Sequence, residues 1–161
     1  MQGTVAQINI SPGGVPKHPV LQARLTPHGV EGDSHDHPQI HGGPRQAVLL
    51  IAAEAIEELK QEGFSVFPGA LGENITMSGI DRRQLRVGQR FRIGEAIVEL
   101  TKLREPCNTL NRYGPGIQKA VFEHKTDHAV PQWAKSGFYA AVISAGWVRP
   151  GDPIQLLDQL A

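Results

Sequence analysis

The sequence contains one cysteine, Cys107, among 161 residues. A single thiol cannot form an internal disulfide, so it is free, metal-bound or paired with another chain, and a reducing compartment is expected. Long apolar runs are also missing, and none approaches the ~20 residues of a membrane-spanning helix. The first residues, MQGTVAQINISPGG, lack the apolar core of a secretory signal peptide. These absences predict a cytoplasmic protein that does not enter a membrane.

The sequence also lacks an excess of charge of one sign. The chain has 16 Lys and Arg against 16 Asp and Glu, and this balance argues against non-specific attraction to nucleic acid or to a membrane surface. It leaves room for a local basic pocket that binds a small anion. The length fits one domain, residues 1–161, and is sufficient to bury a core.

Turn-forming residues, by contrast, are plentiful, with 18 Gly and 12 Pro spread along the chain. Between them lie short runs that alternate apolar and polar residues or are uniformly apolar, as strands do. These runs predict strands at 5–10, 20–25, 47–51, 138–144 and 154–156, and a hairpin over 85–100. Many short strands with few helices predict a mainly β fold, a β-barrel with peripheral helices.

One amphipathic helix is clear in AAEAIEELKQEG, residues 52–63. Apolar residues recur at the three- and four-residue spacings of one helix face, charged residues take the other face, and Gly63 ends the pattern. Shorter helices are predicted within 116–124 and near 131–135. From about residue 115 the chain is therefore expected to be helical before its closing strands.

Four clusters combine glycine or proline with groups that bind anions. They span residues 13–17, 32–35 together with 41–45, 68–74, and 104–109. Glycine lets the backbone approach a ligand and present N–H groups to phosphate or carboxylate. Lys17, Arg45 and Arg104 add positive charge suited to the same groups. The patterns GxxxxGK[ST] and GxGxxG are absent, so the sequence gives no support for ATP or NAD binding.

The histidines and the cysteine leave two other chemistries open. His35, His37 and His41, with Asp36, have side chains that bind zinc, although the spaced cysteine pairs typical of structural zinc sites are lacking. Cys107 with a remote histidine would suit a hydrolase, because catalytic triads assemble in space and not in sequence. The GxSxG pattern of serine hydrolases is absent.

Cys107 lies among polar residues, directly after Pro106, with Arg104 three residues before it and Arg112 five after. A lone cysteine is most often a small buried hydrophobe, but these flanks are not apolar. A helical turn is predicted to begin after Cys107, and a thiol near a helix N-terminus and an arginine is biased towards the thiolate. A thiolate is suited to bind a soft metal or to hold a persulfide.

The ordered motifs resemble the MOSC domain, which is shared with the C-terminal part of molybdenum cofactor sulfurases, and more specifically its small standalone bacterial members. The resemblance rests on SPGGVPK at 11–17, GVEGDSH at 29–35, HGGPRQAV at 41–48, PGALGENIT at 68–76 and REPC at 104–107. Each motif is short, but the set in this order is specific. The part of the chain after about residue 115 contributes little to it.

The resemblance implies a β-barrel with peripheral helices that binds the molybdenum cofactor (molybdopterin), a pterin dithiolene that carries a phosphate. Cys107 matches the family's cysteine and would be the catalytic residue and the molybdenum ligand. The implied activity is reduction of N-hydroxylated compounds, such as hydroxylaminopurines, to amines, with electrons from a separate redox protein. The chain has no second cysteine for an iron–sulfur cluster, which agrees with an external electron donor.

The resemblance also suggests cofactor contacts for eight further residues. Their types suit an anionic, polar ligand: cations beside the phosphate or dithiolene, an amide beside the pterin, carboxylates that touch the cofactor or orient the cations, and histidines that bind it or supply protons near neutral pH. In that order they are Lys17, Arg45 and Arg104; Asn74; Asp33 and Glu73; and His35 and His41.

Two other functions stay open at this point. In one, Cys107 holds a persulfide and the protein is a sulfur carrier for cofactor or metal–sulfur assembly, with no turnover of its own. In the other, the protein binds the cofactor without catalysis, as a sensor or a store. The part after about residue 115 is expected to form a lid or an oligomer contact, such as that of a homodimer.

Overall fold

Strands dominate the structure, a computed structural model that describes residues 1–34, 42–124 and 127–157. In chain order the described strands are β1 (Gln2–Ile10), β2 (His18–Val20), β3 (Ala23–Thr26), β4 (Gly29–Val30), β5 (Val48–Ala52), β6 (Ile75–Ser78), β7 (Arg90–Ile93), β8 (Ala96–Leu103), β9 (Phe138–Ser144), β10 (Gly146–Val148) and β11 (Pro153–Leu156). The described helices are the α-helices α1 (Ala53–Gln61) and α2 (Ile117–Val121) and the 3-10 helices η1 (Arg82–Gln84) and η2 (Asn108–Tyr113).

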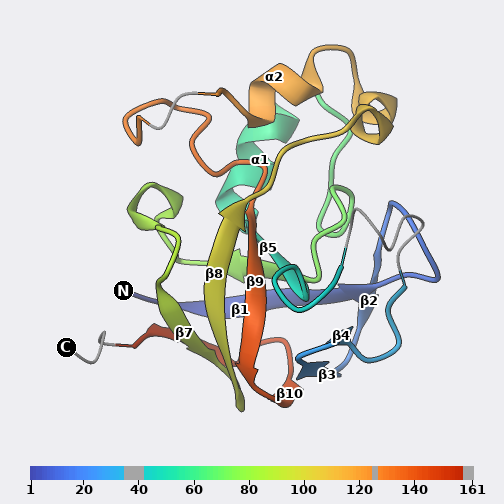
Figure 1. Cartoon of the computed structure of the whole chain (residues 1–161). Helices are drawn as coiled ribbons and strands as arrows, with labels where there is room; N and C mark the ends of the chain where they lie inside the picture. The colour runs from blue at the N-terminus through green and yellow to red at the C-terminus, as the bar shows by residue number, and fades with distance from the viewer. Residues whose placement is uncertain (35–41, 125–126, 158–161) are drawn as a thin grey trace.

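Seven of the strands form a closed barrel (Figure 1). Their order is β11–β7–β8–β9–β5–β6–β1, and β1 closes the barrel by pairing with β11, where Gly3 lies opposite Ile154. The β5–β6 pair, which α1 connects, is parallel. β2 extends the sheet from β1, and β10, β3 and β4 form a separate three-stranded sheet. The predicted fold class, a mainly β barrel with peripheral helices, is confirmed.

β5 is buried on both faces, which explains why its sequence is uniformly apolar. Val48 and Leu50 belong to the barrel core, whereas Leu49 and Ile51 pack in a second cluster beneath the helices. The alternation follows from the two-residue period of a strand. β5 is therefore the wall that separates the barrel core from the helical layer.

The helical layer covers one end of the barrel, where α1 and α2 lie close together in Figure 1. Ile56 and Leu59 of α1 share a buried cluster with Leu110 of η2 and Ile117 of α2. α1 ends just before Gly63, which has a φ of +98° and so takes a conformation that other residues rarely adopt. The predicted helices over 52–63 and within 116–124 are confirmed. No helix in the described part of the chain has the length and apolarity to cross a bilayer.

Two local predictions are wrong. The strand expected over 20–25 is divided into β2 and β3, because the chain bends at Leu21, whose side chain is 90% exposed. The helix expected near 131–135 is a series of turns, in which the Trp133 and Lys135 N–H groups donate to carbonyls three residues earlier. β6 was not predicted as a strand, because it directly follows a glycine-rich cluster that hides its apolar pattern.

Candidate functional site

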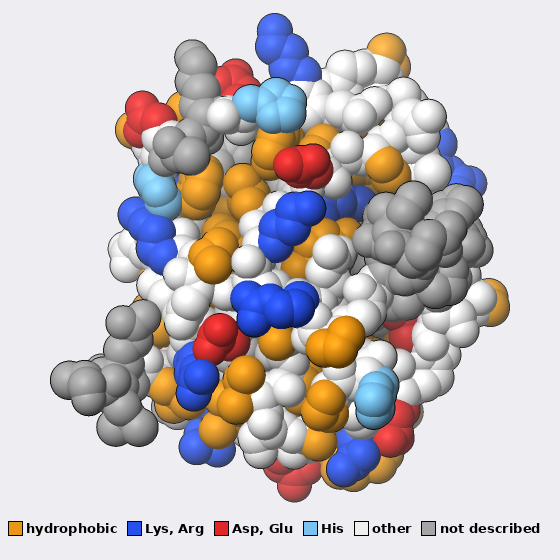
Figure 2. All heavy atoms as spheres, in the orientation of Figure 1, with side chains coloured by type: hydrophobic (Ala, Val, Ile, Leu, Met, Phe, Trp, Pro, Cys, Tyr) orange, Lys and Arg blue, Asp and Glu red, His pale blue; other side chains and the backbone are white. Residues whose placement is uncertain are grey.

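A cavity of about 580 Å³ opens where the helical layer meets the barrel. Its lining comes from residues 14–17, from β5 and the neighbouring Gln46, from 71–74, from 102–112, and from Tyr139 of β9. Three of the four polar clusters predicted from the sequence thus contribute to one cavity. Figure 2 shows Lys and Arg side chains among hydrophobic ones near the middle of the face above β8 and β9. The volume lies in the range of about 300–1,000 Å³ typical of pockets for small ligands.

Lys17 is held on the inner wall of the cavity by a buried ion pair. Its Nζ lies 2.7 Å and 2.9 Å from the two carboxylate oxygens of Asp33, and both side chains are at most 5% exposed. The ammonium also donates to the Ser11 hydroxyl at 3.4 Å and to the Ser34 carbonyl at 3.5 Å. All three ammonium protons therefore have acceptors within the protein. The predicted role of Asp33 as a group that orients a cation fits this geometry.

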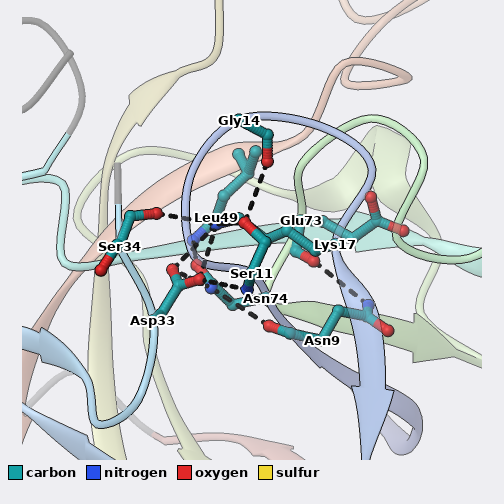
Figure 3. A network of polar contacts seen from close by, with 9 residues as sticks. All are labelled: Asn9, Ser11, Gly14, Lys17, Asp33, Ser34, Leu49, Glu73 and Asn74. Atoms are coloured by element: carbon teal, nitrogen blue, oxygen red, sulfur yellow. Dashed lines mark hydrogen bonds and ion pairs between the residues drawn. The ribbon is translucent and has the colours of Figure 1, made fainter. Parts of the chain in front are cut away.

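Asn74 links the same carboxylate to two strands of the barrel (Figure 3). Its amide nitrogen donates to Asp33 Oδ2 at 2.9 Å and to the Asn9 carbonyl at 3.3 Å, and its Oδ1 accepts the Leu49 N–H at 3.1 Å. The backbone of Asn74 bonds to the same two strands, through the carbonyl of Leu49 and the N–H of Asn9. Asn74 thus lines the cavity and joins β1 to β5.

Glu73 lies behind the lining of the cavity and is fully buried. Its Oε1 accepts the Gly69 N–H at 2.6 Å and the Thr76 hydroxyl at 3.0 Å, while Oε2 has no hydrogen-bond partner among the described residues. Burial raises the pKa of the Glu73 carboxyl above its ordinary value of 4.5, against the opposing effects of these hydrogen bonds and of the Arg104 charge. Burial therefore favours the protonated form of Glu73 more than the unfolded chain does.

Gly69 must be glycine for this arrangement to exist. Its φ is +95°, and a Cβ at this position would clash with the Lys17 carbonyl oxygen. The backbone of the loop at 13–17 consequently approaches the 68–74 cluster closely, and the Lys17 N–H donates to the Gly69 carbonyl at 2.9 Å. The glycine-rich clusters serve here to bring two loops together.

Arg104 lines the cavity although its side chain is only 4% exposed. One terminal nitrogen lies 3.5 Å from the Ser136 carbonyl, and Nε is buried without a hydrogen-bond partner in the described part of the chain. A buried guanidinium with an unpartnered N–H has donor capacity for a ligand. Tyr139 stands beside it: burial raises the pKa of the Tyr139 hydroxyl, and the Arg104 charge opposes that shift.

Cys107 is half-buried and lines the cavity. It precedes η2, so the helical turn predicted after it is confirmed, and its Sγ lies 2.7 Å from the Thr109 hydroxyl oxygen. The thiol is neither sealed in the apolar core nor fully exposed. This position leaves the sulfur accessible to a ligand that occupies the cavity.

The remaining predicted site residues lie away from this cavity or outside the residues that the structure describes. Arg45 is exposed and does not belong to the cavity lining, although its carbonyl accepts the Thr101 hydroxyl. His35 and His41, and with them the candidate zinc site, fall outside the described residues. Within 1–34, 42–124 and 127–157, no three His, Cys, Asp or Glu side chains gather as metal ligands would.

Several lining residues were missed by sequence reasoning. Lys102 and Tyr139 lie opposite each other on β8 and β9, 37 positions apart in the chain, so no local motif connects them. Gln46 precedes β5 and carries no charge that would mark it as a ligand group. Arg112 could have been predicted as a lining residue, because it follows Cys107 by five residues in a helical turn. Its guanidinium donates to the Val15 carbonyl at 2.8 Å.

The fold and the cavity together define a class of protein. It is a small closed β-barrel with a cavity at its helical end, and the lining of that cavity includes Lys102, Arg104 and Arg112 and a thiol. Such a lining suits an anionic small molecule with an atom that binds sulfur.

The chain belongs to the MOSC domain family, because the model of that domain matches residues 37–155. The resemblance predicted from the motifs is thereby confirmed. MOSC domains are associated, as a family, with the molybdenum cofactor.

Similar proteins agree with this assignment. The chain is 33% identical over 150 residues to an uncharacterized protein, YflK, of Bacillus subtilis, and 30% identical over 142 residues to the protein YiiM of Escherichia coli. These alignments cover 91% and 85% of this chain but only 64% and 60% of the two relatives. The crystal structure of YiiM from Geobacillus stearothermophilus matches with a TM-score of 0.73 over 97% of this chain and 75% of the other, at 24% identity, and so supports the fold.

Proposed function

We propose that this protein binds the molybdenum cofactor with Cys107 as the metal ligand, and that it reduces N-hydroxylated compounds, such as hydroxylaminopurines, to the corresponding amines. One observation carries the proposal: the half-buried Cys107 thiol lines a cavity that is also lined by four cationic side chains. They are Lys17, which is ion-paired with Asp33, and Lys102, Arg104 and Arg112. The activity, the substrates and the partners are proposed for a chain that spans less than two thirds of its curated relatives.

The donor set of the cavity fits such a cofactor. A phosphate requires positive charge and N–H donors, and the buried Arg104 Nε has no partner among the described residues. A soft metal with sulfur ligands prefers a thiolate, and Cys107 is the only cysteine of the chain. The volume of about 580 Å³ is adequate for a pterin with a short phosphate arm.

The residues of the chain have separate roles in this proposal. Arg104, Arg112 and Lys102 bind the phosphate, and Cys107 ligates the metal. The Lys17–Asp33 pair and Asn74 fix the inner wall of the cavity that would hold the cofactor. The Tyr139 hydroxyl has a pKa raised by burial, so it stays protonated at neutral pH and is a hydrogen-bond donor in the cavity.

The reaction consumes two electrons and two protons. The N–O bond of a hydroxylamine, R–NHOH, is cleaved, and the products are R–NH₂ and water. The bound cofactor supplies the two-electron chemistry. The chain has one cysteine and no dinucleotide-binding pattern, so the electrons are proposed to come from a separate redox protein.

The test is elemental analysis of protein made in a host that synthesises the cofactor. Wild-type protein is expected to contain close to one molybdenum per chain and to reduce a hydroxylaminopurine with a suitable electron donor. Cys107→Ser is expected to lose at least about tenfold in metal content, because a serine hydroxyl is a poor ligand for a soft metal. Its thermal unfolding should be nearly unchanged, because the thiol is not part of the apolar core.

Thr109→Ser is the matched control. It changes the same 3-10 helix but keeps the hydroxyl beside Cys107 Sγ, so molybdenum content and activity should match the wild type. Equal molybdenum in Cys107→Ser and wild type would contradict the ligand role. Full molybdenum content without any reduction of N-hydroxylated substrates would favour a protein that stores or senses the cofactor.

A sulfur carrier is the second candidate function. The observation that favours it is the position of Cys107 Sγ beside the Thr109 hydroxyl, a polar group that would hydrogen-bond to a persulfide. Intact-mass analysis distinguishes the two functions. A carrier would show a mass increase of one sulfur atom on Cys107 that a thiol reductant removes, and it would contain no molybdenum.

A further inference from the structure

A second pocket, of about 460 Å³, lies next to the cavity that contains Cys107. It is lined on one side by Glu105 and Pro106 and on the other by residues between Gln118 and His124, from α2 and the segment that follows it. Glu105 and Pro106 line the Cys107 cavity as well. The two spaces therefore share a wall only two residues wide.

The shared wall places the second pocket close to the thiol. Pro106 is followed directly by Cys107, and neighbouring Cα atoms lie ~3.8 Å apart. A ligand in the second pocket would therefore lie across Glu105 and Pro106 from the cavity that contains Cys107. This arrangement suits a molecule with a bulky part in one space and a reactive group in the other.

The two spaces differ in charge. The Cys107 cavity has Lys102, Arg104 and Arg112 in its lining, besides the Lys17 that is paired with Asp33, against one carboxylate, that of Glu105. The second pocket has two carboxylates, Glu105 and Glu123, against one Lys119. A phosphate-bearing ligand is therefore favoured in the first space and disfavoured in the second. The second pocket favours a neutral or cationic ligand with N–H groups that donate to carboxylates.

The walls of the second pocket also offer a flat, apolar surface. Phe122 is half-buried and packs against the core cluster beneath the helices, so its ring is held in place. Its ring also contacts that of His124 edge to face, with the ring centroids 5.2 Å apart. Pro106 provides apolar surface on the shared wall. Aromatic side chains held in this way bind planar heterocycles by stacking.

We propose that the second pocket is the substrate site, and that it binds the planar ring of an N-hydroxylated aminopurine or aryl amidine. Phe122 stacks on the ring, Glu105 and Glu123 accept its N–H groups, and the N-hydroxyl group extends past Pro106 towards Cys107. The assignment rests on the proposed reductase function for the chemistry, but ring binding by the pocket is testable separately.

The first test is equilibrium binding by calorimetry, with a hydroxylaminopurine as the probe and cofactor-free protein. Phe122→Leu keeps the apolar volume but removes the stacking face, and we expect Kd to rise at least about fivefold. Glu123→Gln keeps the shape and removes one charge, and we expect a rise of about fivefold. Glu57→Gln, on the exposed face of α1, is the matched control and should leave Kd within about twofold of the wild type.

The second test uses cofactor-loaded protein. Phe122→Leu and Glu123→Gln should raise KM for the hydroxylaminopurine while molybdenum content stays at the wild-type level. An unchanged Kd and KM in both variants would overturn the assignment, even if the wild type is an active reductase. A loss of molybdenum in these variants would also overturn it, because the pocket would then belong to the cofactor.

The two proposals fail in different ways. If the probe binds with the expected dependence on Phe122 and Glu123 but no variant or wild-type protein reduces it, the reductase function is wrong and the ring site stands. Glu123 is on the surface of the pocket, so Glu123→Gln remains informative if Phe122→Leu is too unstable to assay. Thermal unfolding of each variant identifies that case.

Discussion

The inner and outer walls of the Cys107 cavity differ in how their polar groups are satisfied. On the inner wall, the Lys17–Asp33 pair is buried and Asn74 is hydrogen-bonded at both ends of its amide. On the outer wall, Arg104 has a buried Nε without a partner among the described residues, and Cys107 is half-buried with one contact to Thr109. Similar motifs therefore have two roles: the inner groups hold the barrel together, and the outer groups are available to a ligand.

The largest effect is expected at the buried ion pair. Asp33→Ala leaves the Lys17 ammonium buried without its counter-charge, and a loss of about 3–5 kcal/mol in the free energy of unfolding is expected. Urea unfolding measures it. Glu31→Ala is the control, because the Glu31–Arg24 pair is 55% and 41% exposed and should contribute less than about 1 kcal/mol. Similar losses in both variants would remove the distinction between buried and exposed pairs.

The second effect concerns the pH dependence of stability. The pKa of Glu73 is raised in the folded protein, so its stabilising contribution is fully present below the unfolded value of 4.5 and is lost as pH rises through the folded value. Glu73→Gln is always neutral and should flatten this part of the curve. Urea unfolding at about pH 5 and about pH 8 compares the two proteins. If Glu73→Gln loses as much stability between the two pH values as the wild type does, other groups cause the pH dependence.

A smaller effect, on cofactor retention and not on stability, is expected from a change in the outer wall. Arg112→Gln removes one cation from the cavity lining and should weaken cofactor retention about tenfold, since a charge-assisted hydrogen bond contributes about 1.5–3 kcal/mol. Stability should change by less than about 0.5 kcal/mol, as is usual for exposed residues. Molybdenum content after dialysis, together with urea unfolding, tests both parts. A loss of stability without loss of molybdenum would show that Arg112 stabilises the fold and does not bind the cofactor.

The smallest effect is expected at Arg45. Its side chain is exposed and does not contribute to the cavity lining, so Arg45→Gln should weaken cofactor retention by no more than about twofold, through long-range charge alone. The same dialysis experiment measures it beside Arg112→Gln. A loss as large as that of Arg112→Gln would show that Arg45 reaches the cofactor.

The sequence was informative where a pattern is local. The alternation over 5–10, the apolar run at 47–51 and the spacing over 52–63 each follow from the period of one element, and the structure has β1, β5 and α1 there. The strand expected over 20–25 failed because a weak alternation does not reveal the bend at Leu21. Local periodicity therefore predicts elements better than the turns that divide them.

The site was less accessible to sequence reasoning than the fold. Cys107 stood out because a lone thiol among charged residues is unusual. Lys17 also stood out as a cation, but its ion pair with Asp33 depends on two loops that meet in space. Tyr139 and Lys102 are brought together by the register of β8 and β9, which no short motif encodes. Pairings between distant segments decide which polar residues are hydrogen-bonded within the protein and which face the cavity.

Asn74 has a consequence for how a ligand enters. It bonds to β1 and β5 together, on both its backbone and its side chain, so the inner wall opens only if the barrel itself unfolds. The opposite side of the cavity includes the 3-10 helix η2, where the Arg112 guanidinium donates to the Val15 carbonyl at 2.8 Å. We therefore expect a ligand to enter on the η2 side, where local opening leaves the bonds of Asn74 to the two barrel strands intact.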